Sequence, residues 1–190
     1  MLSWFREFLS KWLTNYFRDQ KKTFVIIGLD YAGKTTLTGK IKTGRMIAAN
    51  PSLRPNLEEL RLGQLTFTVY DLGGHKLVRR VWREYCYAAD GIIFVLDAAD
   101  KERMNEAKSE LHNILNDEEF STIPILILGN KIDIVDAMGR EELIGCLNIY
   151  KNIFQEGEKG VSRPIEIFSC STKLDQGYGA GIRWLAKQVT

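Results

Sequence analysis

A glycine-rich segment near the N-terminal end has the residue types that bind phosphate groups. Residues 28–35, GLDYAGKT, match the pattern GxxxxGK[ST] at every position and lie between an apolar run and a helical pattern. Glycines let backbone N–H groups turn toward phosphate oxygens, and the N-terminus of the following helix adds the positive end of its dipole. We expect Lys34 to reach the β- and γ-phosphates and the Thr35 hydroxyl to bind Mg²⁺. The segment predicts a nucleoside triphosphate site without specifying the base.

The sequence DLGGH at residues 71–75 supplies groups that complete such a site. Asp71 ends an apolar run, and an acidic residue there suits the binding of Mg²⁺ directly or through water. The peptide N–H of Gly74 can meet a γ-phosphate, and hydrolysis removes that contact, so we expect a switch. His75 is placed to orient the attacking water, which makes His75 and Lys34 the candidate catalytic residues. The candidate phosphate-binding residues are Asp30, Tyr31, Ala32, Gly33, Lys34, Thr35, Thr36 and Gly74.

A third motif, NKID at residues 130–133, follows an apolar strand and predicts which base is bound. The Asp133 carboxylate can accept two hydrogen bonds from guanine, whereas adenine lacks that pair of donors and would leave the carboxylate unpaired. The stem of Lys131 can cover the purine, and Asn130 can tie this loop to the phosphate loop. A backbone N–H of Ser171, next to Cys170, can meet guanine O6. The candidate guanine-binding residues are Asn130, Lys131, Asp133, Cys170 and Ser171.

Strand-like and helix-like patterns alternate along the chain, which is typical of an α/β fold. A tight turn at Gly63 joins two of the strands as a hairpin, so one edge strand should be antiparallel. We predict a six-stranded, mostly parallel sheet with helices on both faces. The expected strands are 23–28, 57–62, 65–72, 91–97, 124–130 and 164–171. The expected helices are 34–43, 77–89, 101–120, 140–152 and 177–188.

The N-terminal residues predict an additional amphipathic helix. Eight apolar side chains recur on one face over four helical turns, and residues 1–22 hold five basic and two acidic groups. Two tryptophans beside basic residues suit a bilayer interface, although the same apolar face could pack permanently on the domain. We therefore expect a membrane-binding segment at 1–22 and a catalytic domain at 23–190. The apolar side chains are Trp4, Phe5, Phe8, Leu9, Trp12, Leu13, Tyr16 and Phe17.

The composition excludes several classes of protein. The chain has 190 residues, of which 45% are hydrophobic and 26% charged, so it is not of a disordered or low-complexity type. A net charge of +2 gives no bulk field for nucleic acid, and no nucleic-acid partner is expected. Three cysteines without a CxxC pair favour a reducing compartment over a disulfide framework. Leu2 excludes N-myristoylation, and the apolar runs are too short to span a bilayer.

Together these motifs resemble the Sar family of the Ras superfamily, the small GTPases of the COPII coat, over residues 23–190. The stretches that carry the resemblance are AGKTTL at 32–37, FTVYDLGGH at 67–75, RRVW at 79–82 and QGYG at 176–179. The related Arf family has glutamine where this chain has His75, and usually glycine where it has Leu2. The resemblance implies a P-loop NTPase fold of the small-GTPase type. It also implies that hydrolysis of GTP is slow unless an activating protein stimulates it.

The resemblance also implies a set of ligands for Mg²⁺. Small GTPases place a threonine of the first switch loop on the metal, and the corresponding residue here is Ser52. Serine keeps the hydroxyl ligand but lacks the methyl group that restricts the rotamer. The expected metal ligands are thus Thr35, Ser52 and Asp71.

The expected partners follow from the same resemblance. In the GTP state the helix at 1–17 would enter the cytosolic leaflet of the endoplasmic reticulum, and the Golgi is the alternative compartment. Inner COPII coat proteins would act as effector and activating protein, and a membrane exchange factor would load GTP. Two other interpretations stay open: an Arf-like GTPase of another compartment, and a nucleotide-binding scaffold without significant turnover.

Overall fold

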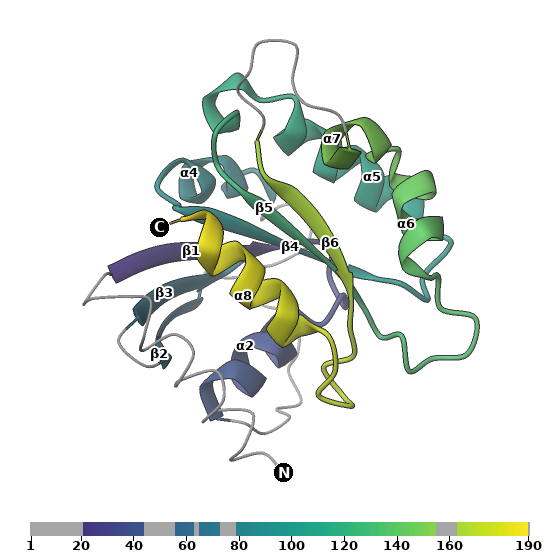
Figure 1. Cartoon of the computed structure of the whole chain (residues 1–190), viewed down its shortest axis with the longest axis horizontal. Helices are drawn as coiled ribbons and strands as arrows, with labels where there is room; N and C mark the ends of the chain where they lie inside the picture. The colour runs from purple at the N-terminus through teal and green to yellow at the C-terminus, as the bar shows by residue number, and fades with distance from the viewer. Residues whose placement is uncertain (1–20, 44–55, 63–64, 73–78, 155–162, 190) are drawn as a thin grey trace.

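The computed structural model describes residues 21–43, 56–62, 65–72, 79–154 and 163–189. Six strands form a single sheet in the order β2-β3-β1-β4-β5-β6 (Figure 1). All neighbouring strands are parallel except β2 and β3, which pair antiparallel from Asn56 opposite Asp71 to Leu62 opposite Leu65. This confirms the six-stranded, mostly parallel sheet and its antiparallel edge. The strands are β1 Lys21–Ile27, β2 Asn56–Leu62, β3 Leu65–Asp71, β4 Gly91–Asp97, β5 Ile125–Asn130 and β6 Ile165–Ser169.

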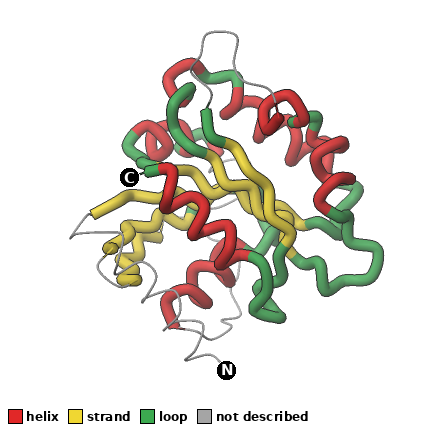
Figure 2. The backbone as a smooth tube through the Cα atoms, in the orientation of Figure 1, coloured by secondary structure: helices red, strands yellow, loops and turns green. Residues whose placement is uncertain are grey.

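Helices cover both faces of the sheet (Figure 2). Alternate residues of β1 belong to different hydrophobic clusters, because successive side chains of a strand point to opposite faces. Phe24 and Ile26 pack in the cluster that contains α2 and α8, whereas Val25 and Ile27 pack in the cluster that contains α4, α5 and α6. The helices are α2 Lys34–Thr43, α4 Trp82–Tyr87, α5 Met104–Leu115, α6 Arg140–Leu147, α7 Tyr150–Phe154 and α8 Tyr178–Gln188.

Two of the expected helices are interrupted in the structure. The helix predicted at 101–120 is α5, followed by a separate 3₁₀ turn, η1 Glu118–Phe120, which begins where the Asp117 side chain accepts a hydrogen bond from the N–H of Glu119. The helix predicted at 140–152 is divided at Asn148, which has a left-handed backbone with φ of 54°. Asparagine tolerates that conformation better than most residues, so it ends α6 before α7 begins.

Other expected elements lie partly or wholly outside the described residues. The helix predicted at 77–89 is described from residue 79 onward and is shorter than predicted: residues 80 and 81 form a turn, and α4 ends at Tyr87. The N-terminal amphipathic helix and the turn at Gly63 are not among the described residues. Of the helices that are described, none has the length and apolar character needed to cross a bilayer.

The carboxyl ends of the parallel strands bring the three motifs to one edge of the sheet. Ile26 of β1 aligns with Asp71 of β3, and Asp97 of β4 aligns with Asn130 of β5. In open α/β sheets this edge is where ligands bind, because the loops that follow the strands converge there.

Candidate functional site

The phosphate loop runs from Gly28 at the end of β1 to Lys34 at the start of α2. The backbone of Leu37 donates to the Gly33 carbonyl at 2.9 Å, which closes the first turn of α2 directly after the loop. Lys34 is buried, and its Nζ donates to the carbonyl of Leu29 at 2.8 Å across the loop. The ammonium group therefore lies inside the curve of the loop, the place from which a lysine contacts β- and γ-phosphates.

Two glycines of the loop are required by close approaches and by backbone conformation. Gly28 has φ of 138°, and a Cβ there would stand 1.9 Å from the Val95 carbonyl oxygen of β4. Gly33 has φ of 97°, and a Cβ there would stand 2.4 Å from the amide nitrogen of Asn130. The phosphate loop is thus pressed against the central strand on one side and the base-binding loop on the other.

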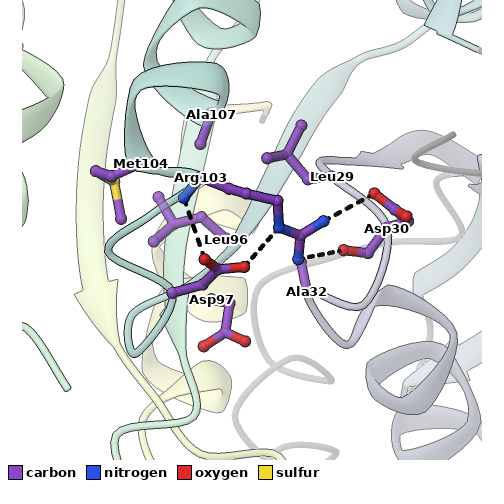
Figure 3. Close-up of a pocket in the computed structure, with 9 residues that line it drawn as sticks. Leu29, Asp30, Ala32, Leu96, Asp97, Arg103, Met104 and Ala107 are labelled. Carbon is purple, nitrogen blue, oxygen red and sulfur yellow. Dashed lines mark hydrogen bonds and ion pairs between the residues drawn. The ribbon is translucent and has the colours of Figure 1, made fainter. Parts of the chain in front are cut away.

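Arg103, just before α5, binds the phosphate loop through Asp30 (Figure 3). Its Nη1 lies 3.0 Å from Asp30 Oδ1, and its Nη2 donates to the Asp30 carbonyl at 3.2 Å. Asp100 accepts from Arg103 Nε at 2.6 Å and from its backbone N–H at 3.1 Å. Burial raises the pKa of Asp100, but the hydrogen bonds from Arg103 outweigh it and hold that pKa below its ordinary value. The Asp100 carboxylate therefore stays ionised at neutral pH and helps to keep Arg103 in place.

Asn130 joins three loops at the end of β5. Its amide nitrogen donates to the Ala32 carbonyl of the phosphate loop at 2.9 Å, which is the tie predicted from the sequence. Its amide oxygen accepts from the backbone N–H of Thr172 at 3.1 Å and lies 3.7 Å from the Cys170 thiol. Asn130 is fully buried, so its amide position is fixed by these partners.

The Asp133 carboxylate is aligned by the loop that follows β6. The Ser171 hydroxyl donates to one of its oxygens at 2.5 Å, and Lys173 lies 3.6 Å from the other. The hydrogen bond from Ser171 is the main cause that holds the pKa of Asp133 below its ordinary value, and Lys173 adds to it. The carboxylate is consequently an acceptor at neutral pH, as recognition of guanine N1–H and N2–H₂ requires.

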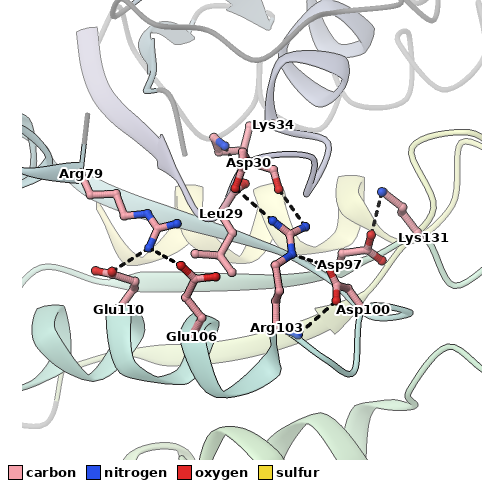
Figure 4. Close-up of polar contacts among 10 residues, drawn as sticks. All are labelled: Leu29, Asp30, Lys34, Arg79, Asp97, Asp100, Arg103, Glu106, Glu110 and Lys131. Atoms are coloured by element: carbon pink, nitrogen blue, oxygen red, sulfur yellow. Dashed lines mark hydrogen bonds and ion pairs between the residues drawn. The ribbon is translucent and has the colours of Figure 1, made fainter. Parts of the chain in front are cut away.

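Lys131 and Cys170 contribute to this region in different ways. Lys131 has a left-handed backbone, and its Nζ pairs with Asp97 of β4 at 2.7 Å, which orients the alkyl stem (Figure 4). Cys170 is fully buried behind the loop, and burial raises the pKa of its thiol to about 12. Cys170 is therefore a packing residue just after β6, and only its backbone could contact a bound ligand.

The expected Mg²⁺ ligands are described in part. Thr35 follows Lys34 at the start of α2, and Asp71 ends β3 beside β1, so both belong to the edge that carries the phosphate loop. A hydroxyl and a carboxylate are the hard oxygen ligands that Mg²⁺ prefers, usually together with substrate phosphates. Within the described ranges, no group of three or more His, Cys, Asp or Glu residues is arranged to hold a metal without such phosphates. Ser52, Gly74 and His75 lie outside the described residues.

Sequence reasoning missed the residues that hold the loops without belonging to a motif. Arg103 is separated from Asp30 by more than 70 positions, and its role depends on the placement of α5 beside the loop. Asp97 carries a weak signal, because it is an acidic residue at the end of a buried central strand. Arg79, after DLGGH, pairs with Glu106 and Glu110 of α5 at 3.0 and 2.9 Å (Figure 4).

Comparison with known proteins extends over nearly the whole chain. The model of the ADP-ribosylation factor family (Arf) matches residues 9–189. The small COPII coat GTPase SAR1 of Giardia intestinalis is 37% identical over 189 residues, covering 98% of this chain and 97% of that protein. SAR1 of Nicotiana tabacum is 34% identical, covering 90% and 91%. ADP-ribosylation factor K of Dictyostelium discoideum is 35% identical, covering 100% and 98%.

A solved structure shows the same arrangement with a nucleotide analogue bound. The small GTPase Arl6 (BBS3) of Trypanosoma brucei with GppNp superimposes with a TM-score of 0.78 at 29% identity, covering 90% of this chain and 98% of that one. The fold and the clustered loops thus define a small GTPase. The chain belongs to the ADP-ribosylation factor family, whose Arf and Sar members are GTP hydrolases, and the predicted resemblance to Sar GTPases is confirmed.

Proposed function

We propose that this chain is a GTP-driven membrane switch that starts assembly of the COPII coat at the endoplasmic reticulum. The observation that carries the nucleotide part is the bond from Asn130 to Ala32, which joins the base loop and the phosphate loop in one site. The COPII part is supported by the near-full-length similarity to two small COPII coat GTPases and by His75 in the DLGGH motif.

The described residues would divide the binding of GTP between its two ends. The backbone N–H groups of residues 30–36 would bind the phosphates at the N-terminus of α2, and Lys34 would exchange the Leu29 carbonyl for phosphate oxygens. Asp133, aligned by Ser171, accepts from guanine N1–H and N2–H₂. Lys131, held by Asp97, lays its stem over the purine. These contacts account for guanine specificity, because adenine would leave a desolvated carboxylate without donors.

Hydrolysis would require Ser52 of the first switch loop together with Gly74 and His75 of the DLGGH segment. Small GTPases use Mg²⁺ with the nucleotide; Thr35, Ser52 and Asp71 would hold the ion, which neutralises charge that develops on the phosphates. The N–H of Gly74 would bind the γ-phosphate, and His75 would orient the attacking water. Water positioning without an arginine gives slow turnover, so an inner coat protein that supplies an arginine in trans would stimulate it.

The membrane part of the proposal rests on residues 1–22, with 23–190 as the GTPase domain. Eight apolar side chains on one face and a net charge of +3 suit the anionic cytosolic leaflet of the endoplasmic reticulum. Release of this helix with GTP would couple the nucleotide to recruitment of coat proteins, and an exchange factor at the membrane would load GTP.

An Arf-like GTPase of another compartment is the second candidate, favoured by the similarity to ADP-ribosylation factor K and to Arl6. The two are distinguished by whether purified COPII inner coat protein stimulates hydrolysis, and the variant His75→Gly tests the role of His75 in that stimulation. With purified COPII inner coat protein present, the unmodified chain should hydrolyse GTP at least about tenfold faster than alone, and the variant should bind GTP but lose that stimulation. Absence of stimulation in the unmodified chain, with normal GTP binding, would favour the Arf-like candidate. Equal stimulation of both proteins would remove His75 from the mechanism.

A further inference from the structure

We propose that Lys40, Asp175 and Tyr178 form a clasp that holds the loop at 171–176, which aligns Asp133, against the phosphate-loop helix α2 and thereby sets how long a guanine nucleotide stays bound. We call these three residues the Asp175 clasp. The inference rests on the proposed guanine site and adds positioning residues that belong to none of its motifs.

The clasp connects two elements that are distant in sequence. Lys40 belongs to α2, its side chain is only 7% exposed, and its Nζ lies 2.9 Å from Asp175 Oδ2. The other oxygen of the same carboxylate, Oδ1, accepts from the Tyr178 hydroxyl at 2.8 Å. Each carboxylate oxygen therefore has its own donor, one from the phosphate-loop helix and one from the start of α8. Both helices lie on the same face of the sheet (Figure 1).

The loop that Asp175 fixes is the one that aligns the base-recognition carboxylate. Ser171 and Gln176 exchange two backbone hydrogen bonds of 3.0 Å, which close the loop around residues 172–175. Inside it the Ser171 hydroxyl accepts from the N–H of Leu174 at 3.0 Å and donates to Asp133. Movement of Asp175 would thus be transmitted through a four-residue loop to the group that orients Asp133.

The chemistry of the clasp favours a closed state. The Lys40 ammonium group is buried, so leaving it without its carboxylate partner costs free energy. Separating Lys40 from Asp175 therefore costs more than separating an ion pair at an exposed surface. Burial raises the pKa of Tyr178, and the nearby Asp175 raises it further, so the hydroxyl remains a donor at any physiological pH. Asp175 also has a left-handed backbone, with φ of 59°, a conformation that its short side chain tolerates.

Helix α2 contains both a residue of the phosphate loop motif and a residue of the Asp175 clasp. α2 begins with Lys34, which faces the phosphates, and Lys40 lies further along the helix at the clasp. The loop at 171–176 therefore cannot move away from the nucleotide without breaking the bond between Asp175 and α2. Opening of the clasp should accompany nucleotide release, and its loss should accelerate release without changing the chemistry at the γ-phosphate.

Dissociation of a fluorescent GDP derivative from the full chain, chased with excess GDP in Mg²⁺, tests the clasp. Lys40→Met and Asp175→Asn should each accelerate dissociation by about fivefold to tenfold, and the double variant by no more than either one, because one pair is lost in each case. Tyr178→Phe should give a smaller acceleration, and Lys40→Arg should restore slow release. Single-turnover hydrolysis of bound GTP should be unchanged in all five variants.

Arg140→Met is the matched control. Arg140 pairs with Glu166 at 2.6 Å and binds the Ile167 carbonyl, so its loss weakens the attachment of α6 to β6 outside the clasp. It should lower the melting temperature while leaving dissociation unchanged. Equal acceleration in Arg140→Met and Asp175→Asn, or release within twofold of the unmodified chain in Lys40→Met and Tyr178→Phe, would overturn the clasp. Failure of the unmodified chain to bind the GDP derivative at all would overturn the proposed function as well.

Discussion

Asn130 and Asp133 lie on the same short segment but do different work. Asn130 has its side chain buried among the Ala32 carbonyl, the Thr172 N–H and the Cys170 thiol, so it is a structural joint. Asp133 accepts from the Ser171 hydroxyl and lies near Lys173, and we propose that its carboxylate also accepts from guanine. Asn130 holds the loops together, whereas Asp133 is proposed to bind the base, so substitutions at the two positions should have different effects on nucleotide binding.

Asp133→Asn should reduce affinity for GDP by about 100-fold or more and admit xanthosine diphosphate, because the amide offers donors where guanine needs an acceptor. The amide oxygen can still accept from Ser171, so the melting temperature of the nucleotide-free protein should change little. Titration calorimetry with both nucleotides measures the exchange of specificity. Tight binding of GDP by this variant would contradict the assignment of Asp133 to the base.

The pH dependence of GDP binding follows from the same carboxylate. The pKa of Asp133 is lower in the folded protein than its ordinary value of 3.8. Because the folded-state pKa is depressed, the carboxylate is ionised at every pH above 3.8. It becomes protonated, and stops accepting hydrogen bonds from guanine, only as the pH falls through the lower folded-state pKa. Protonation of Asp133 should therefore not affect affinity for GDP near neutral pH.

The three cysteines should differ in reactivity as their burial differs. Cys146 is exposed, whereas Cys86 and Cys170 are buried and have thiol pKa values raised to about 12 by that burial. In the folded protein a thiol reagent should label one cysteine rapidly, and in denaturant it should label all three. Mass spectrometry of the labelled peptides identifies the sites. Rapid labelling of Cys170 in the folded protein would show that the base loop opens far more readily than its packing indicates.

At the scale of elements, the phosphate loop is held by three neighbours in addition to its own internal bond from Lys34 to Leu29. β4 approaches Gly28, Asn130 of the base loop binds Ala32, and Arg103 before α5 binds Asp30. The motif alone predicts the loop and the helix that follows it. It does not predict Arg103, because that contact depends on where α5 packs across the sheet.

Arg103→Met should weaken GDP binding by about tenfold, because it removes two charge-assisted contacts to Asp30 while keeping an unbranched side chain in the pocket that Leu29 and Met104 also line. Arg83→Met is the control: Arg83 pairs with Asp117 and Glu119 at an exposed surface, so its loss should leave affinity unchanged. Equilibrium titration of both variants with fluorescent GDP provides the comparison. A similar loss in both would show that Arg103 has no specific effect on the loop.

The boundaries of elements show where sequence patterns reach their limit. The strand–helix alternation predicts the sheet, and Gly91–Asp97 is found with the same bounds. Periodicity did not reveal the breaks at Asp117 and Asn148, because each depends on one local hydrogen bond or one left-handed residue inside an otherwise helical pattern. Similarly, the motifs predict Asn130, Asp133 and Ser171 as site residues but do not predict the Asp175 clasp. Lys40 and Asp175 are 135 positions apart, and Tyr178 belongs to α8, outside the three nucleotide-binding motifs.

At the scale of the whole molecule, the sheet separates two layers of helices that meet the nucleotide site from opposite faces. α2 and α8 lie on the face of the clasp, and α5 lies on the face of Arg103. A site placed at the carboxyl edge between these layers can respond to both, which suits a switch. The motifs, fold class and family agree on a GTPase; the compartment and coat remain the proposal, to which residues 1–22 are central.

Flotation of the full chain with anionic liposomes is the most direct test of that proposal. The chain loaded with a non-hydrolysable GTP analogue should float with the vesicles, the GDP form should stay below, and a chain lacking residues 1–22 should bind nucleotide but not float. This result would establish a membrane helix controlled by the nucleotide. Flotation in neither nucleotide state would contradict the account, because the apolar face of residues 1–22 would then not serve the membrane.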